Sequence, residues 1–287
     1  MRRFVYQPQS WTHSVSYAVG FALVLPLLSW QGAAVWATLH DTLGGWGAFV
    51  GLGFAVYMIV FWLAGGFYIA ADARGWFADA KIQPRPAGRD RSGPPLSRAV
   101  RVVLRNQFLG TLPVLIGLYP LLLWRGLDMA ADPDPWWLVL AHLAGLVLIE
   151  ELGFYSTHRA FHLRPLFKRF HRIHHEFRES IGIATHYVHY VEHLVGNLGP
   201  IFLGVVILCP HPVTIFLWVV LAVVNAIHTH SGYAFRWMVW PHDHDFHHFN
   251  VTGNYGVLGA LDRLLGTDDA FREVARSQRA GLTPPAA

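Results

Sequence analysis

The chain has 287 residues, of which 53% are hydrophobic and only 14% are charged. Soluble domains carry about 25% charged residues, so this composition favours an integral membrane protein and excludes a disordered chain. The single cysteine, Cys209, excludes a disulfide scaffold. The net charge of +4 comes with no nucleic-acid-binding motif, so we expect no nucleic-acid partner.

Apolar segments long enough to cross a bilayer recur along the chain. Residues 14–30, 46–71, 108–124 and 136–155 each approach the ~20 residues that a transmembrane helix needs. A further apolar block, 194–227, is interrupted by Pro210 and Pro212, which predicts a helical hairpin. We therefore predict an all-α integral membrane protein with about four transmembrane helices plus this hairpin. No small-residue cleavage site is evident after Arg2 and Arg3, so we expect no cleavable signal peptide.

The basic residues indicate the orientation of these spans. The link 31–45 has no Lys or Arg, whereas the loop 72–105 has eight and the segment 156–180 has six. The positive-inside rule then places both basic segments, and the histidines that follow them, on the cytoplasmic side. We expect three parts: N-terminal membrane helices with a basic loop (1–135), a catalytic segment (136–270) and a polar tail (271–287).

Histidine is the second outlier of the composition. The chain has 18 histidines, and fifteen of them lie between His158 and His248. They form patterned clusters, HRAFH from His158, HRIHH from His171, HYVH from His186, HTH from His228 and HDHDFHH from His242. We assign no metal role to the isolated His13, His40, His142 and His211.

The spacing within the clusters predicts a metal site. Residues three or four apart lie on one face of a helix, so His158 and His162 project together, and each HxxHH motif forms a triple on one stripe. Neutral imidazole binds iron, copper, zinc and nickel. One zinc ion needs only three or four ligands, so eight to ten imidazoles predict two metal ions. A histidine-rich metal transporter or sensor is the alternative, but such tracts are usually unpatterned.

Acidic residues near the clusters are candidates for fixing the imidazoles. A carboxylate that accepts the second N–H of a metal-bound imidazole orients the ring. Glu150 and Glu151 precede His158 by one to two helical turns, Glu192 follows His189, and Asp262 follows His248. Polar residues at the end of a membrane helix are the simpler interpretation of Glu150 and Glu151.

Taken together, the segments HRAFH, HRIHHEF, HYVHYVE, HSGY, HDFHHFNVTGNYG and LDRLLGTDD resemble the fatty acid hydroxylase/sterol desaturase superfamily, and within it the C4-methylsterol oxidases. The likeness extends upstream to Lys81-Ile82-Gln83-Pro84 and to Asn106-Gln107-Phe108. It implies a histidine-rich helical cap on the cytosolic side of the spans, holding two irons.

The resemblance also implies which residues serve the metals. The ligands it implies are His158, His162, His171, His174, His175, His189, His230, His244, His247 and His248. Asn254 belongs to the turn after the last triple, and Asp262 matches an aspartate that supports the ligands. The superfamily pattern differs at His186 and His228, and these two residues and His242 are additional candidate ligands.

The activity that the resemblance implies is oxidation of a lipid C–H bond with O₂, here most specifically the C4-methyl group of a sterol. A sterol desaturase or a hydroxylase of fatty acyl, sphingoid or carotenoid chains is the alternative. Electrons come from an external donor, such as cytochrome b5 or ferredoxin and its reductase, which Arg164, Lys168, Arg169 and Arg172 could attract. The membrane is the endoplasmic reticulum in a eukaryote or the inner membrane in a bacterium.

Overall fold

The structure is a computed structural model and describes residues 6–7, 32, 35–83 and 93–280. The regular structure of these residues is helical, and the part described contains no strand beyond an isolated bridge between Lys81 and Tyr233. Five helices are long and apolar enough to cross a membrane: Val35–Arg74, Leu96–Trp124, Trp136–Phe161, Tyr190–Leu208 and Pro212–His230. The prediction of an all-α membrane protein is therefore confirmed.

The five helices correspond to most of the predicted spans. The spans predicted at 46–71, 108–124 and 136–155 lie within the first three helices. The predicted hairpin is formed by α8 (Gly199–Leu208) and α9 (Pro212–His230), and Cys209 turns the chain between them with a φ of 46°. The span predicted at 14–30 lies outside the described residues.

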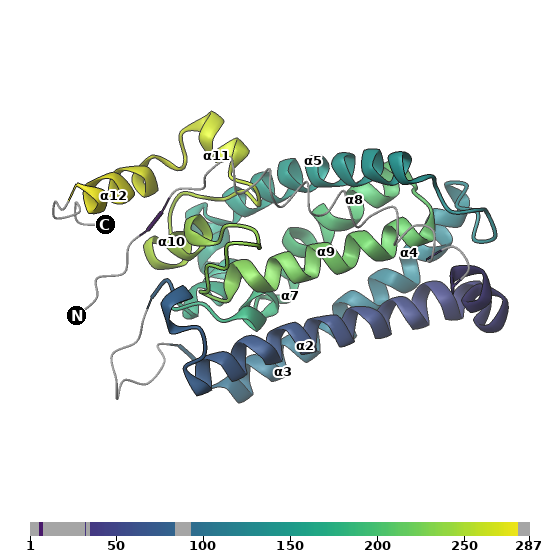
Figure 1. Cartoon of the computed structure of the whole chain (residues 1–287), viewed down its shortest axis with the longest axis horizontal. Helices are drawn as coiled ribbons and strands as arrows, with labels where there is room; N and C mark the ends of the chain where they lie inside the picture. The colour runs from purple at the N-terminus through teal and green to yellow at the C-terminus, as the bar shows by residue number, and fades with distance from the viewer. Residues whose placement is uncertain (1–5, 8–31, 33–34, 84–92, 281–287) are drawn as a thin grey trace.

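The membrane helices pack through small residues. The helix α5 (Trp136–Phe161) lies along α8, and α2 (Gly53–Arg74) lies along α9 (Figure 1). A Cβ atom added at Gly204 would lie 2.9 Å from the Leu146 side chain, and one at Gly153 would lie 3.2 Å from Pro200. Without a hydrophobic force between helices in lipid, such close approach provides the packing energy.

Three of the five long helices contain a π-helical stretch, which in Val35–Arg74 is Gly47–Leu52. In Leu96–Trp124, the residues Gln107–Thr111 are π-helical and join α3 (Leu96–Asn106) to α4 (Leu112–Trp124). Pro113, two residues after this stretch, has no backbone N–H and cannot donate a hydrogen bond to it. In Tyr190–Leu208, the residues His193–Leu198 are π-helical between α7 (Tyr190–Glu192) and α8.

The histidine-rich segments gather at one end of the bundle. They include α6 (Arg164–Leu166), the short helices Phe167–His171, His174–Glu176 and Gly182–His186, and α10 (His242–Asn250). The helices α11 (Ala260–Leu265) and α12 (Asp269–Arg279) lie at the same end, on the left in Figure 1.

The segment that begins at Lys81 ties this end together. Lys81 Nζ lies 2.7 Å from Asp72 Oδ1, at the end of α2, and 3.1 Å from the carbonyl oxygen of Ser231, just after α9. Gln83 Nε2 donates to Asp245 Oδ2 of α10 at 2.8 Å. The upstream likeness noted in the sequence therefore has a structural role, since it joins three helices around the histidines.

Candidate metal centre

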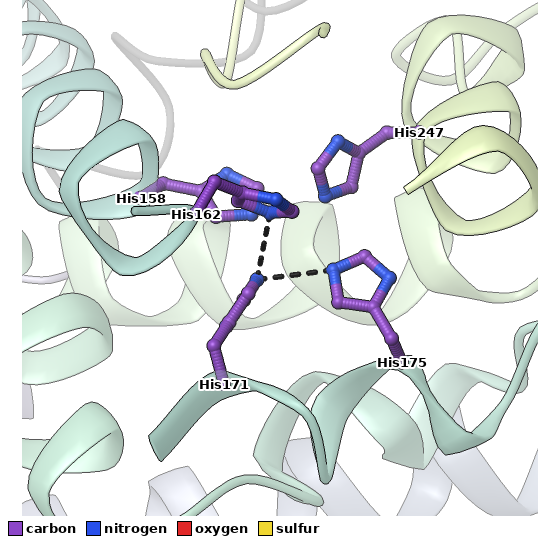
Figure 2. A group of neighbouring side chains, drawn as sticks. All are labelled: His158, His162, His171, His175 and His247. Atoms are coloured by element: carbon purple, nitrogen blue, oxygen red, sulfur yellow. Dashed lines mark hydrogen bonds between the residues drawn. The ribbon is translucent and has the colours of Figure 1, made fainter. Parts of the chain in front are cut away.

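Nine of the ten predicted ligands form two groups of converging imidazoles. Within each group one nitrogen of every ring lies within 4.8 Å of the others. The first group consists of His158, His162, His171, His175 and His247, which Figure 2 shows pointing toward one another from three segments of chain. The second group consists of His174, His230, His244 and His248.

The two HxxHH motifs are shared between the groups. The residues four apart stay together, His171 with His175 and His244 with His248, whereas His174 and His247 each join the other group. The first triple departs from a single regular helical stripe, because the chain changes from a π-helix ending at His171 to a 3-10 helix beginning at His174. The second triple lies within the regular helix α10, and its residues still divide between the two groups. Each motif thus links both groups.

Backbone carbonyl oxygens fix the orientation of four of the rings, two in each group. The Nδ1–oxygen distances are 2.9 Å from His158 to Tyr255, 2.6 Å from His247 to Gly253, 2.7 Å from His230 to Ala226 and 3.2 Å from His248 to Phe177. A carbonyl oxygen only accepts, so the proton of each neutral ring resides on Nδ1 and Nε2 carries a lone pair. These contacts select the nitrogen that faces inward.

The inward nitrogens are close together and have few protein partners. His171 Nε2 lies 2.9 Å from His162 Nε2 and 3.0 Å from His175 Nε2. Among the described residues, the buried Nε2 atoms of His158, His247 and His248 have no hydrogen-bond partner. Converging lone pairs without donors are the arrangement that a metal ion satisfies, so the residues present fit two metal ions.

Burial keeps these rings neutral. Desolvation first, and the neighbouring imidazoles second, lower the pKa of the following ligands outside the membrane-spanning helices: His162, His171, His174, His175, His244, His247 and His248. A neutral imidazole binds a metal ion without first losing a proton.

Glu192 is the carboxylate that touches an imidazole directly. Its Oε1 lies 2.7 Å from Nδ1 of His171, and both side chains are buried. The carboxylate accepts a hydrogen bond from Nδ1–H of His171, and Nε2 of that ring faces the other imidazoles of the first group.

Glu151 and Asp262 support the histidines less directly than the sequence suggested. Their carboxylates accept hydrogen bonds from backbone N–H groups rather than from imidazoles. Glu151 accepts backbone N–H groups of Val257, Leu258 and Leu261 at 2.8, 2.8 and 3.1 Å. Asp262 accepts those of Tyr255 and Gly256, each at 2.7 Å, and the hydroxyl of Thr267 at 2.6 Å. The two carboxylates hold the loop whose Tyr255 carbonyl orients His158.

The remaining two supporting candidates have different surroundings. Glu150 lines a cavity beside the two groups. Asn254 has a φ of 53°, and its backbone N–H donates to the carbonyl oxygen of Thr267 at 3.0 Å. This turn places the neighbouring Gly253 carbonyl against His247.

Four other histidines of the sequence motifs lie outside both groups. His189 Nδ1 accepts the backbone N–H of Val191 at 3.1 Å and caps α7. The other three make the following contacts through Nδ1: His186 with Tyr57 Oη at 2.9 Å, His228 with Tyr68 Oη at 2.7 Å and His242 with the Gln7 N–H at 3.4 Å. The structure thus brings together nine of the implied ligands and separates His189 and the additional candidates from them.

The sequence reasoning missed two kinds of supporting group. The carbonyl oxygens that orient the rings carry no sequence signal, because every residue has one. Asn106, noted only as part of an upstream likeness, donates from Nδ2 to the carbonyl oxygens of His186 and Val188 at 3.0 and 2.9 Å. The available sequence signal was the amide side chain of Asn106 just before the predicted span 108–124.

A cavity lies against both groups. His158 and His171 of the first group line it, as do His174, His230 and His244 of the second. Phe154 and Phe161 of α5 and Ile201 of α8 supply apolar wall. The cavity therefore combines inward-facing imidazoles with an apolar wall.

The fold and the site thus define a multi-pass membrane protein with two groups of histidines that could each hold a metal ion. Residues 143–267 match the family model described as fatty acid hydroxylase. Fatty acid hydroxylase domain-containing protein 2 of Homo sapiens is 34% identical over 267 residues, which cover 89% of this chain and 78% of that relative. The chain belongs to the fatty acid hydroxylase family.

Two further relatives have more specific names. Methylsterol monooxygenase 1 of Rattus norvegicus is 32% identical over 181 residues, covering 60% of this chain and 61% of that protein. Fatty acid hydroxylase ahd1 of Mycosarcoma maydis is 32% identical over 221 residues, covering 72% and 54%. No solved structure matches the chain. Membership of this family makes the chain an oxidoreductase that acts on lipids.

Proposed function

We propose that each histidine group holds one iron ion and that the chain oxidises a C–H bond of a lipid, most specifically the C4-methyl group of a sterol. The observation that carries the proposal is the convergence of nine imidazoles, eight of them buried, in two groups that share both HxxHH motifs. Because each motif supplies histidines to both groups, the two ions would be held close enough to act on one substrate.

The donor set supports iron. Imidazole nitrogen suits iron, and neither group contains a thiolate, which would favour zinc. Iron bound there supplies the activation of O₂ that attack on an unreactive C–H bond requires. The protein itself positions the lipid, orients the imidazoles through Nδ1 and keeps water away with the phenylalanines of the cavity wall.

Electrons must reach this buried site from another protein. Arg164, Lys168, Arg169 and Arg172 are exposed on the segment that carries His171, whose imidazole belongs to the first group. We propose that this basic surface, on the cytoplasmic side, receives an acidic donor such as cytochrome b5 or ferredoxin. Positively charged flanks are also what the positive-inside rule requires, so the docking proposal needs its own measurement.

The relatives support two substrate classes. The methylsterol monooxygenases favour a sterol, and the fatty acid hydroxylase ahd1 favours an acyl chain. Expression in a yeast that lacks its own C4-methyl oxidase distinguishes the two. Restored growth with loss of 4,4-dimethylsterols supports the sterol, whereas hydroxylated fatty acids without that rescue support the acyl chain.

Metal analysis of the purified protein tests the chemistry independently of the substrate. We expect about two iron ions per chain and O₂ consumption that depends on added lipid and reductant. A protein that binds metal but consumes no O₂ under these conditions would be the transporter or sensor instead. Zinc alone would not decide, because nitrogen ligands also bind zinc.

A further inference from the structure

The cavity beside the histidine groups contains an unusual side chain, Asn225 of α9. A carboxamide within a membrane helix is costly unless it is hydrogen-bonded. Among the described residues, the buried Oδ1 atom of Asn225 has no hydrogen-bond partner. The amide oxygen and nitrogen are interchangeable by rotation of the side chain, so this group can accept or donate.

Two neighbouring polar side chains of the cavity are engaged with the protein. Asn197 Nδ2 donates to the carbonyl oxygen of Thr185 at 2.9 Å. The hydroxyl of Thr229 donates to the backbone carbonyl oxygen of Asn225 at 3.1 Å. Glu192 also lines the cavity and has no partner for Oε2 among the described residues, but its Oε1 lies 2.7 Å from Nδ1 of His171. Asn225 thus offers the cavity an uncharged polar oxygen that no described protein group satisfies.

An apolar pocket lies beside the cavity. It lies between membrane helices and is lined by residues that include Phe49, Leu115, Phe202, Phe216 and Val219. His186 and Ile201 line both spaces. The helix α9 runs past both, because Val223 lines the apolar pocket and Ala222 and Asn225 line the cavity. The cavity thus offers polar contacts beside the histidine groups, and the neighbouring pocket offers an apolar compartment.

The position of Asn225 relates it to the second histidine group. It precedes His230 of the second group by five residues on α9, and both residues line the same cavity. A polar group held by Asn225 therefore lies in the same space as a carbon that faces the second histidine group.

We infer that Asn225 binds a hydroxyl group of the lipid, so that the substrate is an alcohol whose oxidised carbon lies close to that hydroxyl and whose hydrocarbon occupies the apolar pocket. The inference rests on the proposed function and specifies its substrate class. Asn225 is a specificity-determining residue in this assignment, and it takes no part in metal binding.

The test compares two lipids on the iron-loaded protein, 4,4-dimethylcholestanol and the same sterol without its 3-hydroxyl group. Binding is measured by competition with the radiolabelled alcohol, and turnover is measured separately. One hydrogen bond to an otherwise unpaired group predicts roughly tenfold tighter binding of the alcohol. In Asn225→Leu we expect this ratio to fall to about one through weaker binding of the alcohol, with unchanged iron content.

Ile201→Val is the matched control, because it alters the same cavity without changing a polar group, and we expect it to preserve the ratio. Equal binding of both sterols by the unmodified protein would overturn the inference, as would a preserved ratio in Asn225→Leu. If Asn225→Leu does not fold, the binding ratio of the two sterols on Asn225→Ser and on the unmodified protein still tests the inference. Failure of the iron-loaded protein to oxidise any lipid would overturn the proposed function, while the binding ratio would still test Asn225.

Discussion

The histidines of this protein fall into two populations that differ in what Nδ1 does. In the metal groups, Nδ1 of His158, His230, His247 and His248 donates to a backbone carbonyl oxygen. Outside them, Nδ1 of His189, His211 and His242 accepts a backbone N–H. The first contact leaves Nε2 as a lone pair, whereas the second places the ring proton on Nε2.

This difference explains why neither the number of histidines nor the burial of an imidazole identifies a metal ligand. His193 and His228 are as buried as His247, with no exposed surface, yet neither joins a group. Their contacts are hydroxyl groups, Thr111 for His193 and Tyr68 for His228, and a hydroxyl can donate or accept. A carbonyl partner for Nδ1 together with convergence of Nε2 is the more specific criterion.

The largest expected effect is loss of a ligand from the first population. His247→Ala removes an imidazole that faces four others, so we expect loss of metal and a fall in turnover of more than about 100-fold. Metal content per chain and product formation measure this. His189→Ala, from the second population, should retain both metal and activity. Equal loss of metal in His189→Ala and His247→Ala would contradict the division of the histidines into two populations.

A smaller effect is expected from Glu192, which orients His171 through a carboxylate rather than a carbonyl. Glu192→Leu should weaken metal binding by about 10–100-fold, because the imidazole loses its Nδ1 acceptor. Metal titration in the presence of a competing chelator measures the affinity. Glu176→Gln serves as the control, since Glu176 contacts Tyr187 and Arg98 and no imidazole of the groups. Unchanged affinity in Glu192→Leu would contradict this role.

A third variant concerns Asp262, which supports the loop whose Tyr255 carbonyl orients His158. Asp262→Ala leaves two backbone N–H groups and the Thr267 hydroxyl without their acceptor, so we expect a loss of about 2–4 kcal/mol in the free energy of unfolding. Thermal unfolding in detergent measures the loss. Metal affinity should fall less than in His247→Ala; a stable variant with normal metal content would show that the loop holds without this carboxylate.

The smallest effect is expected within the second population. His211 caps α9 by accepting the Val213 N–H at 3.1 Å, and its Nε2 lies 3.1 Å from the carbonyl oxygen of Ala131. Loss of such a cap costs about 1 kcal/mol. His211→Ala should lower the thermal midpoint slightly and leave the metal content unchanged. A metal-deficient His211→Ala protein would contradict the proposed division of the histidines.

The spans were predictable because apolar length alone identifies a membrane helix, and the proline-rich break at Cys209 marked the hairpin. The convergence was predictable to the extent that spacing and resemblance named nine histidines that do converge. The group that each histidine joins was not predictable, because the chain changes helix type at His174 and because spacing along one helix does not say which neighbouring segments supply the other rings. The roles of Glu151 and Asp262 also required the structure, since a carboxylate that binds backbone looks the same in sequence as one that binds imidazole.

The division of both HxxHH motifs between the groups has a consequence for how the protein matures. Neither group is complete until the segment 244–248 has been synthesised and has folded against residues of α5 and α9. Under the proposed function, loading of either group with its full set of imidazoles therefore follows synthesis of this late segment of the chain.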